Sequence, residues 1–204
     1  MAKQRPLIDE TTFIVIDTET SGLNPKTSRI LSIGAVKVHR NIIDLEEELE
    51  LYLQPADQYE PQSIPIHGIL PTTAQGQVSD AIAAQQLTEY LGNHIIVGHH
   101  IAFDVKMMNQ LIKTHTGTKL KNRVLDTGVL VKRVLAKNAY YSPKSLSLDA
   151  LCEQFSIKMH DRHTASGDAL LTSLLLLKIF AQLKKRGVVQ TRDLFPTFSI
   201  LGRH

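Results

Sequence analysis

Two acidic residues, Asp17 and Glu19, follow directly on four apolar residues at 13–16. Residues two apart in a β-strand project from the same face, so these carboxylates are expected side by side, with their Cα atoms roughly 6–7 Å apart. Burying an unpaired carboxylate is costly. The pair therefore needs a metal ion, a basic partner or open water, and a strand that ends at the surface can also carry such a pair without further purpose.

Two further acidic residues stand where helices are expected to begin. Asp104 follows the apolar segment 95–101, and Asp168 lies in the first turns of a leucine-rich segment. Either carboxylate could simply stabilise a helix N-terminus. Combined with Asp17 and Glu19 they could instead bind Mg²⁺ or Mn²⁺, and two such ions about 3.5–4 Å apart can hold both the attacking and the leaving oxygen of a phosphodiester.

His163 lies five residues before Asp168. Five helical residues rotate by about 500°, so His163 is expected on the loop that enters the helix rather than on the helix itself. Histidine gains and loses a proton near neutral pH, which suits a general base that deprotonates the attacking water. The alternative is an ordinary exposed loop histidine, since the chain contains nine histidines.

The hydrophobic pattern predicts an α/β fold with a mixed five-stranded sheet flanked by helices. Antiparallel strands come first and alternating strands and helices follow, after an irregular, proline-rich segment at 54–79. Strands are predicted at 12–19, 29–39, 45–55, 95–101 and 123–127. Helices are predicted at 80–91, at 102–116 with Gly117 as the stop, at 128–137 with Asp126 or Thr127 as the cap, at 145–155, and over a leucine-rich segment that contains 169–183 and ends at 184–187.

Length and composition suit a single domain over residues 1–204, with a core at about 10–187 and a loosely packed C-terminal extension at 188–204. The net charge of +3 leaves open whether the partner is a polyanion. One cysteine, Cys152, excludes a disulfide framework, and the first ten residues lack the apolar core of a signal peptide. The segment 169–183 is shorter than the roughly 20 apolar residues of a membrane span. A cytoplasmic protein without membrane contact is expected.

Three segments in this order, DTETSGL at 17–23, HHIAFD at 99–104 and HTASGDA at 163–169, resemble the motifs of the DEDDh exonucleases, the DnaQ-like superfamily of the DNA polymerase III proofreading subunit. The resemblance implies a ribonuclease-H-like fold and metal-dependent removal of nucleoside 5′-monophosphates from the 3′ ends of nucleic acids. It also implies two bound Mg²⁺ or Mn²⁺ ions and His163 as the general base. The metal ligands that it implies are Asp17, Glu19, Asp104 and Asp168.

The same resemblance implies contacts with the substrate. The segment 20–23 occupies the place where the family meets the terminal nucleotide, although Ser21 and Gly22 need only form a turn. His100 stands where many members have asparagine, which leaves hydrolysis unaffected but puts the substrate contacts and the pH dependence in question. The predicted substrate-binding residues are Thr20, Ser21, Gly22, Leu23, His67, Gly68, His100 and Phe103.

Single-stranded DNA is the preferred substrate hypothesis, with a proofreading or repair role. The alternatives are an RNA-trimming exoribonuclease of the same superfamily and a nucleic-acid-binding polymerase adaptor without catalysis. A zinc site built on His160 and His163 is a third alternative, but no cysteine pair accompanies these histidines. The segment QTRDLF at 190–195 resembles peptides that bind sliding clamps; packing of Leu194 and Phe195 on the core is the preferred interpretation.

Overall fold

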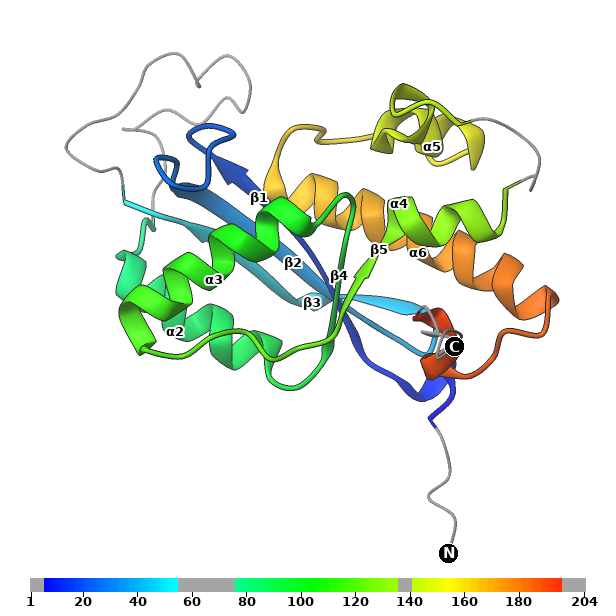
Figure 1. Cartoon of the computed structure of the whole chain (residues 1–204), viewed down its shortest axis with the longest axis horizontal. Coiled ribbons are helices and arrows are strands. Elements are labelled where there is room, and N and C mark those ends of the chain that lie inside the picture. The colour runs from blue at the N-terminus through cyan, green and yellow to red at the C-terminus, as the bar shows by residue number, and fades with distance from the viewer. Residues whose placement is uncertain (1–5, 55–75, 136–140, 196–204) are drawn as a thin grey trace, which may run out of the picture.

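The computed structural model describes residues 6–54, 76–135 and 141–195 of the 204-residue chain. Its centre is one five-stranded sheet with the strand order β3-β2-β1-β4-β5 (Figure 1). The strand β2 pairs antiparallel with both β1 and β3, whereas β4 pairs parallel with β1 and β5 pairs parallel with β4. This confirms the predicted mixed sheet. The strands are β1 (Phe13–Thr20), β2 (Ile30–His39), β3 (Ile42–Tyr52), β4 (Ile95–Gly98) and β5 (Val124–Asp126).

Helices cover both faces of the sheet (Figure 1). The α-helices are α2 (Asp80–Leu91), α3 (Ala102–Thr116), α4 (Thr127–Leu130), α5 (Leu148–Gln154) and α6 (Ala165–Lys185). Short 3₁₀ helices are η1 (Ile8–Glu10), η3 (Val131–Arg133), η4 (Lys144–Leu146) and η5 (Thr191–Leu194). Side chains of α2 and α3 join one buried apolar cluster, and side chains of α4, α5 and α6 join the other.

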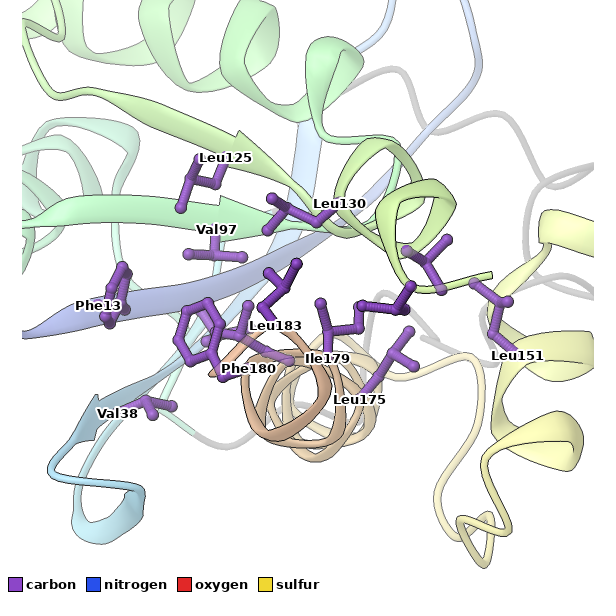
Figure 2. Close-up of a cluster of buried hydrophobic side chains, with 14 of the residues drawn as sticks. Phe13, Val38, Val97, Leu125, Leu130, Leu151, Leu175, Ile179, Phe180 and Leu183 are labelled. Carbon is purple, nitrogen blue, oxygen red and sulfur yellow. The ribbon is translucent and has the colours of Figure 1, made fainter. Parts of the chain in front are cut away.

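The central strand β1 contributes alternate side chains to these two clusters. Phe13 and Val15 pack with α6, whereas Ile14 and Ile16 pack with α2 and α3. Figure 2 shows the α6 side of this arrangement, in which the rings of Phe13 and Phe180 lie 5.0 Å apart. Apolar packing on both faces therefore fixes the strand immediately before Asp17 and Glu19.

The long helix α6 is apolar enough, by length and composition, to span a membrane, and it is the one such helix in the described ranges. However, 61% of its apolar window is buried inside the protein. Its side chains form much of the cluster shown in Figure 2. The leucine-rich segment is therefore the expected core helix.

Several predicted boundaries were wrong. The strand β3 begins at Ile42, before the predicted start at residue 45. The strand β4 ends at Gly98 rather than at Ile101, because the chain turns back and Ile101 packs so closely that a Cβ atom on Gly98 would lie 2.7 Å from its Cδ1.

The predicted helix at 128–137 was also wrong in length. It is reduced to the single turn of α4 followed by η3. The guanidinium of Arg186, beyond the end of α6, donates to the carbonyl oxygens of Arg133 and Val134. A longer helix would use these two carbonyl oxygens as hydrogen-bond acceptors, but they are bound to the side chain of Arg186 instead.

The segment 188–195 packs on the core, so the prediction of a loosely packed extension was wrong for these residues. The Ile8 amide donates to the Val189 carbonyl at 2.9 Å, and Leu194 is 2% exposed. Phe195 packs against the same cluster, and the Arg123 guanidinium stacks 3.4 Å from the centre of its ring. Packing of Leu194 and Phe195 on the core is confirmed, and residues 196–204 lie outside the described ranges.

A glycine allows the start of α6 to approach the sheet. Gly34 pairs with Asp17 across the ladder between β1 and β2. A Cβ atom on Gly34 would lie 2.2 Å from the backbone nitrogen of Ser166, a separation that no side chain can adopt without movement of the helix. The first turn of α6, which carries Asp168, is thereby held against the end of β1.

Replacing Gly34 with alanine is expected to push the start of α6 away and lower the free energy of unfolding by about 1–3 kcal/mol, the usual cost of overpacking. Urea denaturation measures this change. Gly22→Ala is the matched control, because its Cβ atom would meet a side chain rather than backbone: the Ser28 hydroxyl lies at 2.9 Å and can rotate. Equal losses in the two variants would contradict the role of the close contact at Gly34.

Candidate active site

Three of the predicted metal ligands form a compact group at the end of β1. Asp17 and Glu19 project from the face of β1 that α6 covers, and Asp168 lies in the first turn of α6. One carboxylate oxygen from each residue lies within 4.8 Å of the others. The Oδ1 atom of Asp168 is buried and has no hydrogen-bond partner among the described residues. Carboxylate oxygens in this arrangement fit a hard divalent cation.

Burial and mutual repulsion disfavour the charged forms of these acids. Burial raises the pKa of Asp17 well above its usual range, and the charges of Asp104, Asp168 and Glu19 raise it further. The pKa of Glu19 is raised to about 7 by burial, and then by the charge of Asp168. A bound cation would reverse this balance, since it favours the ionised carboxylates.

The fourth predicted ligand, Asp104, approaches from the other face of the sheet. It lies in the first turn of α3, and its Oδ1 atom accepts a 2.6 Å hydrogen bond from the hydroxyl of Thr18. Thr18 stands between Asp17 and Glu19 and therefore projects from the opposite face of the strand. Asp104 is not a member of the compact group, but of the neighbouring carboxylates its charge has the largest effect on the pKa of Asp17. All four acids thus reach the same end of β1.

An arginine that was not predicted from the sequence lies within this acidic site. The guanidinium of Arg162 donates through Nη1 to Asp168 and through Nε to Asp149, at the start of α5. Its charge also lowers the pKa of Asp17 and of Glu19, opposing the effect of burial. Two considerations could have indicated Arg162 from the sequence. It directly precedes His163, and a buried cluster of acidic residues needs a counter-charge.

His163 lies on the turn before α6, as predicted, and its side chain is exposed. Its backbone is left-handed, with φ of 65°. The pKa of Asp149 is lowered first by its hydrogen bond from Arg162 and also by the charge of His163, so His163 lies within electrostatic reach of Asp149. The general-base role of His163 stays a prediction. His160 and His163 both lie outside the helices, so the helical face that the zinc alternative needs is not formed.

The segment after β1 forms a hydrogen-bonded turn. The hydroxyl of Thr20 donates to the Gly22 carbonyl at 3.0 Å, and the Ser21 side chain accepts from the Arg29 amide at 3.1 Å. Leu23 follows with 90% of its surface exposed. The turn that Ser21 and Gly22 were expected to form is present, and it leaves the apolar side chain of Leu23 exposed shortly after Glu19 in the chain.

Of the other four predicted substrate-binding residues, the structure describes His100 and Phe103. Phe103 is half-buried against the α2 and α3 cluster. His100 is exposed, with φ of 54°, and its amide donates to Asp126 at 3.2 Å. Asp126 caps α4 by accepting from the Gly128 amide, so its interpretation as a cap rather than a ligand agrees with the geometry. His67 and Gly68 lie outside the described residues.

Comparison with known proteins agrees with this arrangement. The family model for the exonuclease domain named RNase_T matches residues 14–176. The chain is 30% identical over 182 residues to the DNA polymerase III subunit epsilon of Aquifex aeolicus, covering 89% of this chain and 86% of that protein. The chain therefore belongs to the exonuclease family, in its DnaQ-like 3′–5′ branch.

Other relatives are much longer. The chain is 28% identical over 186 residues to the PolC-type DNA polymerase III of Thermotoga petrophila, covering 91% of this chain but 13% of that polymerase. PolC-type polymerase III of Bacillus subtilis is also 28% identical, over 183 residues, with 89% of this chain and 12% of the polymerase covered. The chain thus corresponds to a small part of these relatives.

Solved structures show the same fold. Escherichia coli exonuclease I in complex with a dT13 oligonucleotide aligns with a TM-score of 0.72 and 18% identity, covering 87% of this chain and 43% of that one. A zinc-bound form of the exonuclease I complex with single-stranded DNA aligns with a TM-score of 0.73 and 21% identity, over 86% of this chain and 42% of that one. The predicted ribonuclease-H-like architecture is thereby confirmed.

The raised pKa of Glu19 predicts a pH dependence of stability without divalent cations. Between its usual pKa of 4.5 and about 7 the folded state holds a proton that the unfolded state releases, so the free energy of unfolding should fall as pH rises through this range. Asp17, Asp104 and Asp168 face the same site and repel the charged form, while Arg162 opposes them.

Glu19→Gln should make that fall shallower, as measured by urea denaturation at pH 4.5 to 7.5 with a chelator present. Glu48→Gln, which changes an exposed glutamate on β3, is the control and should leave the slope as in the wild type. An unchanged slope in Glu19→Gln would contradict the raised pKa of Glu19.

Proposed function

We propose that this chain is a metal-dependent 3′-to-5′ exonuclease that releases nucleoside 5′-monophosphates from the ends of single-stranded DNA. The observation that carries the proposal is the compact carboxylate group of Asp17, Glu19 and Asp168, with one buried oxygen of Asp168 left without a hydrogen-bond partner among the described residues. In a member of the exonuclease family, such a group would hold the cations that stabilise the charge developing on the phosphate during phosphodiester hydrolysis.

Each residue has a defined part in this proposal. Asp17, Glu19 and Asp168 would hold divalent cations together with Asp104, whose carboxylate Thr18 orients from the other face of β1. When bound, two Mg²⁺ or Mn²⁺ ions would supply Lewis-acid stabilisation of the charge that develops on the phosphate and on the leaving 3′-oxygen. His163 would take the proton of the attacking water, for which its exposed position on the turn before α6 leaves access.

Substrate contacts are assigned to the turn after β1. Its backbone and the exposed side chain of Leu23 would meet the terminal nucleotide, since they follow Glu19 directly after the end of the strand. His67, Gly68, His100 and Phe103 stay predicted contacts of the family pattern.

DNA is the favoured substrate because the relatives are DNA polymerases and the aligned exonuclease I complexes contain DNA oligonucleotides. RNA trimming by the same chemistry is the alternative, since the carboxylate group acts on the phosphate and does not distinguish the sugar. The non-catalytic adaptor is less favoured because all four acids and His163 are present.

Association with a polymerase is a further part of the proposal, and it rests on the polymerase III relatives. A cytoplasmic location suits such a role. Clamp binding through residues 190–195 is not included, because Leu194 is 2% exposed and would have to leave the core to meet a clamp.

Hydrolysis of oligonucleotides tests the proposal directly. With 5′-labelled single-stranded DNA and RNA of one sequence, the wild type should produce a ladder that shortens from the 3′ end only when Mg²⁺ or Mn²⁺ is present, and faster on DNA. Asp17→Asn should abolish the ladder, since it removes one of the clustered carboxylates. Binding without shortening would favour the adaptor, and faster shortening of RNA would favour the exoribonuclease.

His163→Ala is expected to lower turnover by about 10²-fold or more, the usual scale for loss of a general base, while metal affinity stays near that of the wild type. Single-turnover hydrolysis and a parallel metal titration separate these two effects. His160→Ala is the matched control, because His160 is an exposed histidine three residues away, outside the acidic group. Turnover of His163→Ala equal to that of the control would refute the general-base assignment.

A further inference from the structure

Arg162 is shared between two carboxylates that differ in their surroundings. Its Nη1 atom donates to Oδ2 of Asp168 and its Nε atom donates to Oδ1 of Asp149. The side chain of Asp168 is 12% exposed and belongs to the compact acidic group, whereas that of Asp149 is 50% exposed and lies outside it. One guanidinium therefore spans the acidic site and a solvent-facing acceptor.

Positive charge stabilises the ionised forms of the clustered carboxylates. Asp17, Glu19 and Asp168 hold their oxygens close together. The charge of Arg162 acts on Asp17 and Glu19, and its guanidinium forms an ion pair with Asp168. A divalent cation that binds these oxygens would also neutralise their negative charge. It would share Asp168 with the guanidinium of Arg162. The two positive groups then repel each other and compete for one carboxylate.

We propose that Arg162 is a displaceable counter-ion of the metal site, which neutralises Asp168 in the metal-free protein and yields it to a divalent cation while remaining bound to Asp149. This inference rests on the proposed metal-binding function of the site. It makes Arg162 a residue that sets the affinity of the site for the metal. Because the bond to Asp149 uses Nε, it can persist when the Nη1 bond to Asp168 is lost.

Asp149 is placed to receive the arginine. It lies in the first turn of α5, whose N-terminus is capped by the Ser147 hydroxyl accepting from the Ala150 amide. Without Asp149, the guanidinium would have Asp168 as its remaining carboxylate partner and would oppose the metal more strongly. Removal of Arg162 and removal of Asp149 should therefore change metal affinity in opposite directions.

Calorimetric titration with Mn²⁺, in the absence of nucleic acid, tests the competition on the full chain. Arg162→Gln should bind Mn²⁺ about tenfold more tightly than the wild type, because the competing charge is gone. Asp149→Asn should bind it more weakly, and Arg162→Lys, which keeps the charge, should stay closer to the wild type than Arg162→Gln does.

Arg29→Gln is the matched control. Arg29 forms an ion pair with Asp80 at 2.7 Å, and its side chain is 25% exposed against 21% for Arg162, but Asp80 is not part of the acidic group. This variant loses an arginine ion pair of similar exposure and should keep the Mn²⁺ affinity of the wild type. Its comparison separates competition at the site from a general change in charge.

Thermal unfolding with chelator gives a second readout. Metal-free Arg162→Gln should melt at a lower temperature than the wild type, since the carboxylates lose their counter-charge, and saturating Mn²⁺ should raise its melting temperature by more than it raises that of the wild type. A merely structural arginine would lower the melting temperature and leave Mn²⁺ affinity unchanged or weaker.

The inference is overturned if Arg162→Gln binds Mn²⁺ no more tightly than the wild type, or if Arg29→Gln shows the same gain. Absence of Mn²⁺ binding in the wild type would overturn it as well. If the predicted order of affinities is found but no nucleic acid is shortened, the proposed exonuclease function fails while the role of Arg162 stands.

Discussion

Repulsion among carboxylates at the end of β1 is the constraint on which the rest of the structure depends. Asp17 and Glu19 lie on a strand buried on both faces, and Asp168 is brought to them by a helix that cannot move away without opening the core. The acids are therefore held together by apolar packing rather than by attraction to one another. The raised pKa of Asp17 and of Glu19 is the direct consequence, and it makes the site a strong acceptor of positive charge.

The alternation of one strand assembles the site from two layers. Side chains on one face of β1 meet Asp168 from α6, while Thr18 on the other face binds Asp104 from α3. Asp104 and Asp168 both lie in the first turn of a helix, where the helix dipole favours negative charge and offsets part of the cost of burial. Two helices on opposite sides of the sheet can thus direct their N-termini at the same strand end without competing for the same space.

Sequence patterns predicted those parts of the fold that local chemistry decides. The end of α3 at Gly117, with φ of 71°, and the cap of α4 at Asp126 follow from residues within one turn of the boundary. The length of α4 and the place of Arg162 could not be found this way. Arg186 binds carbonyls that lie some fifty residues earlier in the chain, and Asp149 holds Arg162 from a separate helix, so both features arise only when distant segments meet. The acids were predictable as a set, but the separation of Asp104 from the other three required the pairing of Thr18 to be known.

His99, which directly follows β4, connects the turn before α3 with the segment before α5. Burial, with the charge of His100, lowers the pKa of His99 to about 4, so its ring is neutral near pH 7 and can donate from Nε2 to the Leu146 carbonyl while Nδ1 accepts from the Thr127 hydroxyl. Leu146 directly precedes Ser147, the cap of α5, and α5 carries Asp149. The turn between β4 and α3 is thereby hydrogen-bonded, through His99, to the segment that positions Asp149, the second carboxylate partner of Arg162. The described residues between β5 and α6 accordingly support the acidic site from outside, although they contribute none of the four predicted metal ligands.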